Sequence, residues 1–191
     1  MNIDGQAERE LTRRIASGDE AAFDTVFRAY YPQVVWAAES VLRERSTAEE
    51  LAQDVMLELW RRRESLRLET SLRAYLYQAA RNRALNHIRH EKIVLRSNAA
   101  AIAEGPAESP AADSRIAEGE LDSAIREAVT RLPERCRETF ELSRTQGLKY
   151  AEIAAVLGVS VKTVEARMGQ ALRELRRDLA AWLPSKKGGI G

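Results

Sequence analysis

The sequence predicts an all-α fold, with two small helical domains joined by a flexible linker and a helix-turn-helix in the second domain. Apolar residues recur at intervals of three and four along most of the chain, whereas the alternation typical of β-strands is nearly absent. Residues 93–119 are rich in Ala, Glu, Ser, Pro and Gly, so they cannot bury much apolar surface. We therefore expect domains at 1–92 and 120–183, an acidic linker at 93–119 and a disordered tail at 184–191.

The composition excludes several classes of protein. The chain has 191 residues, of which 45% are hydrophobic and 31% charged, so packed cores are possible. A net charge of +1 argues against a uniformly basic coat protein, and Cys136, the single cysteine, cannot form an internal disulfide. No apolar run reaches the length of a membrane span, and the N-terminus lacks the apolar core of a signal peptide. We expect a cytoplasmic protein that does not insert into a membrane.

Residues 1–42 predict three amphipathic helices. Leu11 and Ile15 indicate a short first helix that ends at Gly18. Asp19 is a suitable N-cap for the second helix. Pro32 fits the first turn of a third helix, whose buried residues would be Val34, Val35, Ala38, Val41 and Leu42.

An acidic face characterises the next predicted helix, residues 46–63. Overlapping capping boxes within 46–50 start it, and Leu51, Val55 and Leu59 mark its buried side. The other side carries Glu49, Glu50, Gln53, Asp54 and Glu58. The helix dipole accounts for acids in the first turn, but it does not account for those further along. A compact acidic face suits a basic protein partner and would repel DNA.

The predicted helix at 71–92 has a basic and aromatic face. Off its apolar stripe lie polar side chains suited to nucleic acid, namely Arg81, Asn82, Arg83, Asn86 and Arg89. Arginine binds phosphate, and asparagine can pair with an adenine edge. Tyr75 and Tyr77 can stack on exposed bases, and core packing is the alternative for both.

No set of residues in the sequence indicates catalysis or a cofactor. His87 and His90 lie on the basic helix, but no cluster of cysteines or carboxylates accompanies them. No nucleophile–base set or phosphate loop is visible either. We expect no metal, no cofactor and no enzymatic activity.

Residues 120–147 predict two helices that meet at Pro133. The first has an apolar face made of Leu121, Ala124, Ile125, Ala128, Val129 and Leu132. The second would bury Phe140 and Leu142 and end at Gly147.

Residues 150–168 predict the helix-turn-helix. A helix over 150–157 would end at Gly158, since positive φ costs glycine little. Ser160 is a suitable N-cap for a second helix, which would bury Val164, Met168, Leu172 and Leu175. The outward side chains are Lys162, Thr163, Glu165, Arg167, Gln170 and Arg173. Polar and basic side chains at this end of a recognition helix can reach base edges in a major groove, and a helical hairpin with a solvated face is the alternative.

Four motifs, in this order, resemble those of bacterial sigma factors of the sigma-70 family, extracytoplasmic-function group. Residues 48–60 resemble region 2.2, the polymerase-binding helix, and residues 72–82 resemble regions 2.3 and 2.4, which melt and read the −10 element. Residues 132–138 resemble the start of region 4, and residues 150–173 resemble region 4.2, the −35 reader. The resemblance covers nearly all of residues 19–180.

The resemblance implies roles for three sets of residues. The polymerase contacts would be Glu50, Gln53 and Asp54. The −10 surface would comprise Tyr75, Arg81, Asn82, Arg83, Asn86 and Arg89. The −35 surface would comprise Ser160, Lys162, Thr163, Glu165, Arg167, Gln170 and Arg173. Tyr75 stands where the family often has Trp, Leu72 where it has Phe and Asn86 where it has Asp, so the preferred −10 sequence stays open.

The implied function is to bind core RNA polymerase, direct it to a class of promoters and help open the DNA. Core polymerase, promoter DNA and an anti-sigma factor would be the partners. Two alternatives stay open. A free-standing helix-turn-helix regulator would not need the acidic face at Glu50, Gln53 and Asp54, and a sigma-mimic decoy for an anti-sigma protein would not need Arg81, Arg83 and Arg167.

Overall fold

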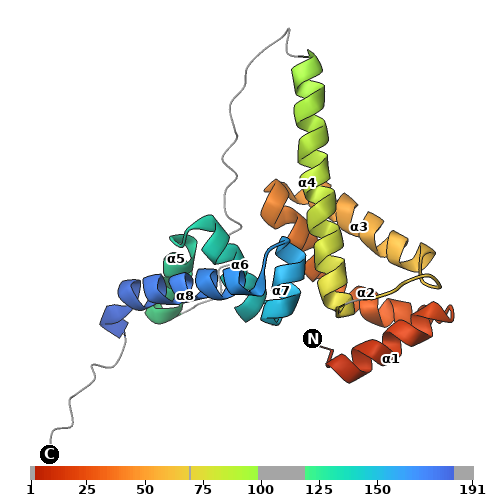
Figure 1. Cartoon of the computed structure of the whole chain (residues 1–191), viewed down its shortest axis with the longest axis horizontal. Helices are drawn as coiled ribbons and strands as arrows, with labels where there is room; N and C mark the ends of the chain where they lie inside the picture. Colours follow the sequence, from red (N-terminus) through yellow and green to blue (C-terminus); the bar gives the residue numbers. More distant parts are fainter. Residues whose placement is uncertain (1–2, 69, 99–118, 183–191) are drawn as a thin grey trace, which may run out of the picture. The chain divides into compact units, whose positions relative to one another are not determined.

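The computed structural model describes residues 3–68, 70–98 and 119–182. These residues form eight α-helices and one short 3-10 helix, and no strand occurs among them (Figure 1). The all-α prediction is confirmed. The chain divides into two compact units: α1 to α4 belong to the first, and α5, α6, α8 and the start of α7 belong to the second.

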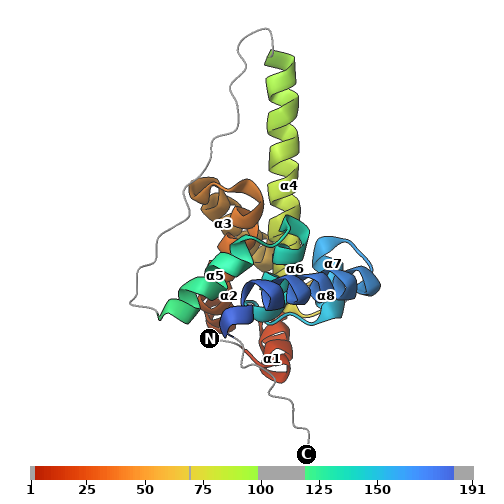
Figure 2. The same ribbon diagram turned by 90° about the vertical axis from the view of Figure 1, so that its left-hand side faces the viewer.

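The N-terminal unit is a four-helix arrangement centred on α2 (Figures 1 and 2). Its helices are α1 (Gly5–Ala16), α2 (Glu20–Leu42), α3 (Arg45–Arg61) and α4 (Leu72–Asn98). Helix α2 packs against the other three, and α4 also contacts α1 and α3. Fully buried side chains from α2, α3 and α4 form the core, among them Tyr30, Val34, Leu59, Leu76 and Ala80.

The turn between α1 and α2 forms as its sequence predicts. Gly18 has a φ of 87°, a conformation that costs glycine little. The Asp19 carboxylate accepts a hydrogen bond from the backbone N–H of Ala22 at 3.0 Å. The predicted first helix and the Asp19 N-cap are therefore confirmed.

The predicted helix break at Pro32 is wrong, because α2 continues through this residue. Proline cannot donate to the carbonyl of residue 28, which removes one hydrogen bond from the helix. The Pro32 ring is on the exposed side of α2, where water can reach that carbonyl. The buried neighbours Tyr30 and Val34 hold both halves of the helix against the core, so packing outweighs the missing bond.

The predicted capping boxes of α3 are also wrong. The N-cap is Glu44, whose carboxylate accepts from the backbone N–H groups of Ser46 at 2.7 Å and Thr47 at 2.6 Å. The preceding residue, Arg43, adopts a left-handed conformation with a φ of 58°, which ends α2 immediately before this cap. The side chain of Glu44 thus takes the role that the sequence pattern assigned to the residues after it.

Helix α4 begins at the predicted place and runs further than predicted. The Ser71 hydroxyl accepts from the backbone N–H of Ala74 at 3.2 Å and caps the first turn. The helix continues past the expected end at Lys92 to Asn98, and no glycine or proline interrupts this stretch before Gly105. Its far end projects beyond α1, α2 and α3 (Figures 1 and 2).

The C-terminal unit is organised around α8. Its elements are α5 (Glu120–Thr130), α6 (Glu134–Arg144), the start of α7 (Tyr150–Leu157), α8 (Val161–Asp178) and a 3-10 helix, η1 (Ala180–Trp182). Helices α5 and α6 both pack against α8. Their shared core consists of Ala128, Leu132, Cys136, Ala171 and Leu175. Burial raises the pKa of the Cys136 thiol, as expected for a structural cysteine.

Three details of the C-terminal core differ from the prediction. Leu121 and Ile125 are exposed, because α5 meets α8 only through its later turns. In α8, Val164, Met168 and Leu175 are buried as predicted, but Ala171 is buried in place of Leu172, which is half-buried. Phe140 is half-buried and packs at the edge of the core.

Two predicted segments fall largely outside the described residues: most of the linker, from 99 to 118, and the tail at 184–191. Among the helices that the structure describes, none is long and apolar enough to cross a membrane.

Candidate functional site

The turn between α7 and α8 has the local geometry of a helix-turn-helix. Gly158 has a φ of 65°, and the N–H of Val159 donates to the carbonyl of Ala154 at 3.0 Å. The Ser160 hydroxyl accepts from the backbone N–H of Thr163 at 3.1 Å and also bonds the Thr163 hydroxyl at 2.8 Å. The glycine turn and the serine N-cap are therefore confirmed. The Ser160 hydroxyl is occupied by these two hydrogen bonds, so its role in this structure is to stabilise the turn.

The outer face of α8 presents most of the predicted −35 side chains to solvent. Its exposed members are Lys162, Glu165, Gln170 and Arg173, whereas Thr163 and Arg167 are half-buried. Within the described part of the chain, Lys162, Arg167 and Arg173 form no ion pair, so their charges are available to phosphate. Arg167 lies close enough to Cys136 for its charge to act on the thiol, which places it beside α6.

The predicted −10 residues divide between one face of α4 and its two flanks. With 3.6 residues per turn, Tyr75, Asn82, Asn86 and Arg89 share a face. Arg81 and Arg83 lie on opposite flanks of that face. Asn82, Asn86 and Arg89 are exposed, and Arg89 donates to the Asn86 amide oxygen at 2.8 Å. Tyr75 is half-buried, so part of its ring is accessible for stacking.

Tyr77 belongs to the core and cannot stack on a base in this structure. Its side chain is 1% exposed, and its hydroxyl donates to the Gln33 amide oxygen at 3.2 Å. Its ring meets that of Trp36 edge-on, with the centroids 6.2 Å apart. Burial raises the pKa of the Tyr77 hydroxyl. Of the two interpretations of this tyrosine, core packing is correct.

The acidic face of α3 is present as predicted, with Glu50, Gln53 and Asp54 all exposed. Asp54 is within 3.7 Å of the Arg83 guanidinium on α4, so the predicted protein-binding face adjoins the predicted DNA-binding helix. Glu49 pairs with Arg45 at 2.8 Å, and Glu58 pairs with Arg62. These pairs leave Glu50 as the acid of this face without a salt bridge to a described residue.

Leu57 is a surface residue that the sequence analysis missed. It is 44% exposed and lies one turn after Gln53 and Asp54 on the same side of α3. The signal was available, because Leu57 falls off the apolar stripe that Val55 and Leu59 define. The core of a protein interface is more apolar than its polar rim, so an exposed leucine within the acidic face is a candidate contact for a protein partner.

A row of aromatic rings joins α2 to the end of α3. Phe23 and Phe27 lie along α2, and the Phe23 ring is 5.1 Å from that of Trp60. The rings of Phe27 and Tyr31 stack at 4.8 Å, and the Arg63 guanidinium is 4.6 Å from the centre of the Trp60 ring. This row fixes the end of α3 against α2.

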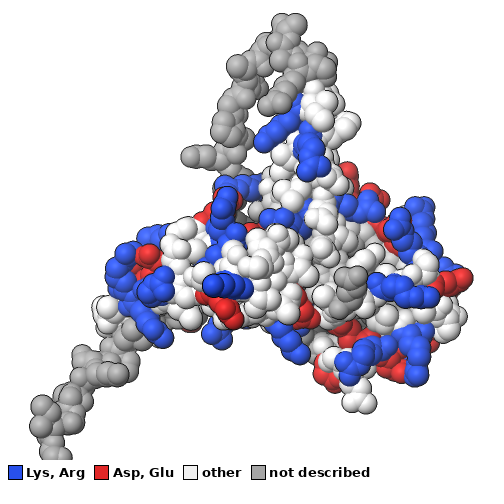
Figure 3. Space-filling model, in the orientation of Figure 1, with Lys and Arg blue, Asp and Glu red and all other residues white. Residues whose placement is uncertain are grey.

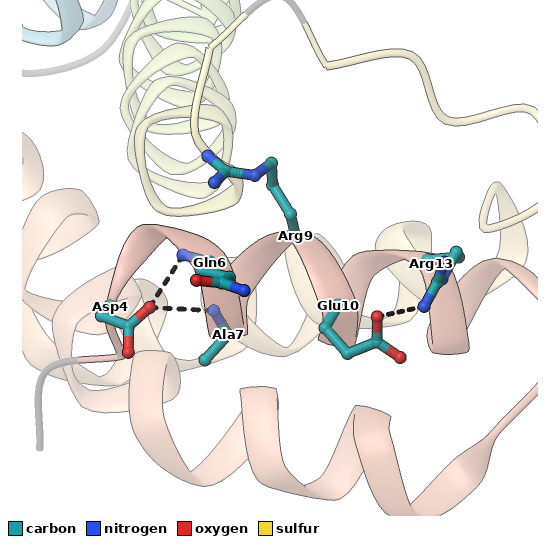
Figure 4. A pocket seen from close by; sticks show the side chains of 6 residues that line it. All are labelled: Asp4, Gln6, Ala7, Arg9, Glu10 and Arg13. Carbon is teal, nitrogen blue, oxygen red and sulfur yellow. Dashed lines mark hydrogen bonds and ion pairs between the residues drawn. The ribbon is translucent and has the colours of Figure 1, made fainter.

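The open depression beside α1 does not have the features of a ligand site (Figure 4). Its described lining comes from α1 and its N-cap alone: Asp4, Gln6, Ala7, Arg9, Glu10 and Arg13. Asp4 caps the helix, and Glu10 pairs with Arg13, so these charges already have partners. No group of His, Cys, Asp and Glu suited to a metal ion occurs among the described residues.

Lysine and arginine side chains gather on the projecting end of α4, where acids are few, and on α8 (Figure 3). Each unit thus carries a basic surface on a helix that also presents amide side chains. Such surfaces bind the phosphate backbone and read base edges.

Comparisons with known families match two separate segments of the chain, one in the first compact unit and one almost entirely in the second. Residues 26–93 match Sigma-70 region 2, and residues 122–175 match Sigma-70, region 4. The first match includes α3 and most of α2 and α4, and the second includes the helix-turn-helix.

Curated relatives and solved structures extend the similarity to nearly the whole chain. The ECF RNA polymerase sigma factor SigK of Mycobacterium tuberculosis (strain ATCC 25618 / H37Rv) is 32% identical over 174 residues, or 88% of this chain and 91% of SigK. SigM of the same strain is 30% identical, over 90% of this chain and 84% of SigM. The fold is similar to that of the sigma factor RpoE in its complex with the anti-sigma factor NepR from Bartonella quintana. That match has a TM-score of 0.59 and 24% identity, over 83% of this chain and 96% of RpoE. It is also similar to CnrH in complex with the cytosolic domain of CnrY, with a TM-score of 0.58 and 24% identity, over 91% of this chain and 97% of the matched chain.

Proposed function

The chain belongs to the extracytoplasmic-function (ECF) group of RNA polymerase sigma factors, and we propose how its surfaces divide the work of promoter-directed initiation. A sigma factor binds core polymerase and directs it to promoters, while the polymerase makes the RNA. The ordered matches to region 2 and region 4 on separate helical units are the observation that carries this function.

We assign polymerase binding to the acidic face of α3, with Glu50, Gln53 and Asp54 as contacts. All three side chains are exposed, and the opposite side of the helix packs into the core through Ala52, Val55 and Leu59. Acid on this face favours a basic protein surface and disfavours the phosphate backbone. The same helix lies within the region 2 match, which supports this assignment.

We assign −35 recognition to α8. Ser160 and Thr163 set the start of the helix, and Lys162, Glu165 and Gln170 project from its first turns. Arg167 and Arg173 would contact phosphate or a guanine edge, since arginine binds both. Such a helix docks into the major groove of duplex DNA, with its N-terminal residues on the bases.

We assign −10 recognition and strand opening to α4. Asn82, Asn86 and Arg89 form an exposed polar row on α4, and Tyr75 lies on the same face nearer the start of the helix. The asparagines would read base edges, Tyr75 would stack on an unpaired base, and Arg81 and Arg83 would hold phosphates from the flanks. Unstacking a base costs a few kcal/mol, so the opened strand would be held only while the polymerase supplies further contacts.

We also propose that residues 1–92 form region 2 and that residues 120–183 form region 4. As a further protein partner we propose an anti-sigma factor. RpoE and CnrH are both similar in fold; the structure of RpoE is of its complex with the anti-sigma factor NepR, and that of CnrH is of its complex with the cytosolic domain of CnrY. Such a regulator would compete with polymerase for an exposed surface of this chain.

Run-off transcription with core polymerase and a genomic promoter library tests the proposed function. The expected result is RNA whose start sites depend on this chain and share −10 and −35 sequences. A chain that binds duplex DNA without polymerase, and starts no RNA, would instead be a free-standing regulator. A chain that binds only an anti-sigma protein would be a decoy.

A further inference from the structure

Glu8 is a buried carboxylate on α1, outside the residues that match region 2. Its side chain is 6% exposed, and no other charged residue in the described part of the chain is buried to this degree. The match to region 2 begins at residue 26, so it does not include this helix. A buried carboxylate is costly unless hydrogen bonds replace its water, and those bonds indicate what Glu8 does.

Both oxygens of Glu8 have partners on other helices. Oε1 accepts from the backbone N–H of Leu72 at 2.6 Å, and Oε2 accepts from the Tyr30 hydroxyl at 2.6 Å. Leu72 is the first residue of α4, and Tyr30 is in the middle of α2. One side chain therefore joins α1, α2 and the start of α4.

The first turn of α4 is capped from two sources. The N–H groups of a first helical turn have no partner inside the helix. Ser71 supplies an acceptor for Ala74 through its hydroxyl and for Tyr75 through its carbonyl. Leu72 points its N–H at Glu8, and the positive end of the helix dipole favours a carboxylate there.

Stability alone is a poor explanation for this arrangement. An apolar side chain of similar size often stabilises a core as well as a buried charge does. Directed hydrogen bonds do something that an apolar contact does not, because the bond to Leu72 ties the first residue of α4 to α1 and the bond from Tyr30 ties the same carboxylate to α2, which fixes the start of α4 relative to both helices. Tyr75 follows Leu72 within one turn, and Asn82 and Asn86 continue the same face.

We propose that Glu8 is a positioning residue for the −10 reading face of α4. It holds Leu72, and through the rigid helix it sets where Tyr75, Asn82 and Asn86 meet the opened strand. The inference rests on the proposed assignment of α4 as the −10 reader. It gives α1 a role in promoter recognition without any contact between α1 and DNA.

The test uses two variants that distinguish the effect of the length of the Glu8 side chain from the effect of its charge. Glu8→Asp keeps the carboxylate but shortens the side chain by one methylene, so it loses the bond to Leu72. Glu8→Gln loses the charge, but its amide oxygen can accept from Leu72 and its amide nitrogen can donate to the Tyr30 oxygen. Glu10→Asp, a matched change at an exposed position of α1, is the control.

Holoenzyme is assembled from each variant and core polymerase. Its binding to a single-stranded oligonucleotide with the −10 sequence of a promoter selected by run-off transcription is compared with binding to a scrambled oligonucleotide. We expect Glu8→Asp to reduce this discrimination about tenfold, since small misplacements of reacting or reading groups have large effects. Glu8→Gln and Glu10→Asp should stay within about twofold of the original protein. Affinity for core polymerase should not change in any variant, because α3 is untouched.

Each outcome bears on one claim. Undiminished discrimination by Glu8→Asp, or a loss in Glu8→Gln as large as in Glu8→Asp, would overturn the positioning role. If Glu8→Asp fails to assemble with polymerase, a loss of discrimination in Glu8→Gln would still overturn the role, and Glu8→Leu, which offers Leu72 no acceptor, becomes the variant that must lose discrimination. Failure of the original protein to discriminate at all would instead refute the assignment of α4 as the −10 reader.

Discussion

The guanidinium of Arg83 on α4 lies 3.7 Å from the carboxylate of Asp54 on α3. The two side chains are 37% and 59% exposed, so this ion pair contributes at most about 1 kcal/mol to stability. Its interest is functional, because Asp54 is a proposed polymerase contact and Arg83 a proposed DNA contact. A basic polymerase surface that engages Asp54 would release Arg83 towards phosphate.

Replacing Asp54 with Arg should abolish binding to core polymerase and leave the fold intact. The new guanidinium would meet a basic partner surface and would also face Arg83, and like charges brought together at an interface cost several kcal/mol. Affinity for core polymerase and a thermal melt of the variant measure both effects. Asp24→Arg is the matched control, since Asp24 is exposed on α2 and pairs only locally with Arg28. Unchanged polymerase affinity in Asp54→Arg would contradict the assignment of the α3 face.

Replacing Leu57 with Ser should weaken polymerase binding without lowering stability. Leu57 is 44% exposed, so its removal leaves no cavity in the core, but it would uncover the apolar centre of the acidic face. We expect a loss of about 1–2 kcal/mol in binding to core polymerase, measured by titration, and an unchanged melting temperature. Leu95→Ser, at the exposed end of α4, is the control. Equal behaviour of the two variants would remove Leu57 from the interface.

The helix-turn-helix was predictable because its determinants are local. Gly158 needs only a positive φ, and Ser160 needs only the N–H groups of the helix it starts. The start of α3 was not predictable in this way, because several residues there could act as a cap and Glu44 forms the cap through two short hydrogen bonds. The continuation of α2 through Pro32 was not predictable either, because tertiary packing outweighs the local preference of proline.

The contacts that join distant parts of the chain were not predictable from spacing. Glu8 and Leu72 are 64 residues apart, and nothing in the pattern of either segment distinguishes this glutamate from its exposed neighbours. The pair of Arg83 and Asp54 depends on how α3 and α4 cross, which periodicity does not determine. Sequence therefore identified the helices that carry the candidate surfaces, while the structure shows how these helices are held together.

Replacing Arg167 with Ala should weaken binding to −35 duplex DNA by about 1–3 kcal/mol if the guanidinium contacts a base bidentately. Arg167 is half-buried, and its charge acts on the Cys136 thiol, which places it on α8 beside α6. Binding of holoenzyme to a matching duplex and to a scrambled duplex distinguishes a base contact from a phosphate contact. A loss on both duplexes would indicate a phosphate contact, and no loss on either would exclude Arg167 from the reader.

The cap at Glu44 should make the stability of the N-terminal unit depend on pH. Hydrogen bonds from the hydroxyl and backbone N–H of Thr47, and from the backbone N–H of Ser46, hold the pKa of Glu44 below its ordinary range. A carboxyl whose pKa is lower in the folded state contributes its full stability above the unfolded pKa, about 4.3, and loses it as the pH falls through the folded pKa. Glu44→Gln should therefore melt at a lower temperature than the original protein at pH about 7, and the difference should shrink in acid. Glu64→Gln, an exposed position after α3, is the control, and a difference that is constant from neutral to acid pH would show that Glu44 does not act through its charge.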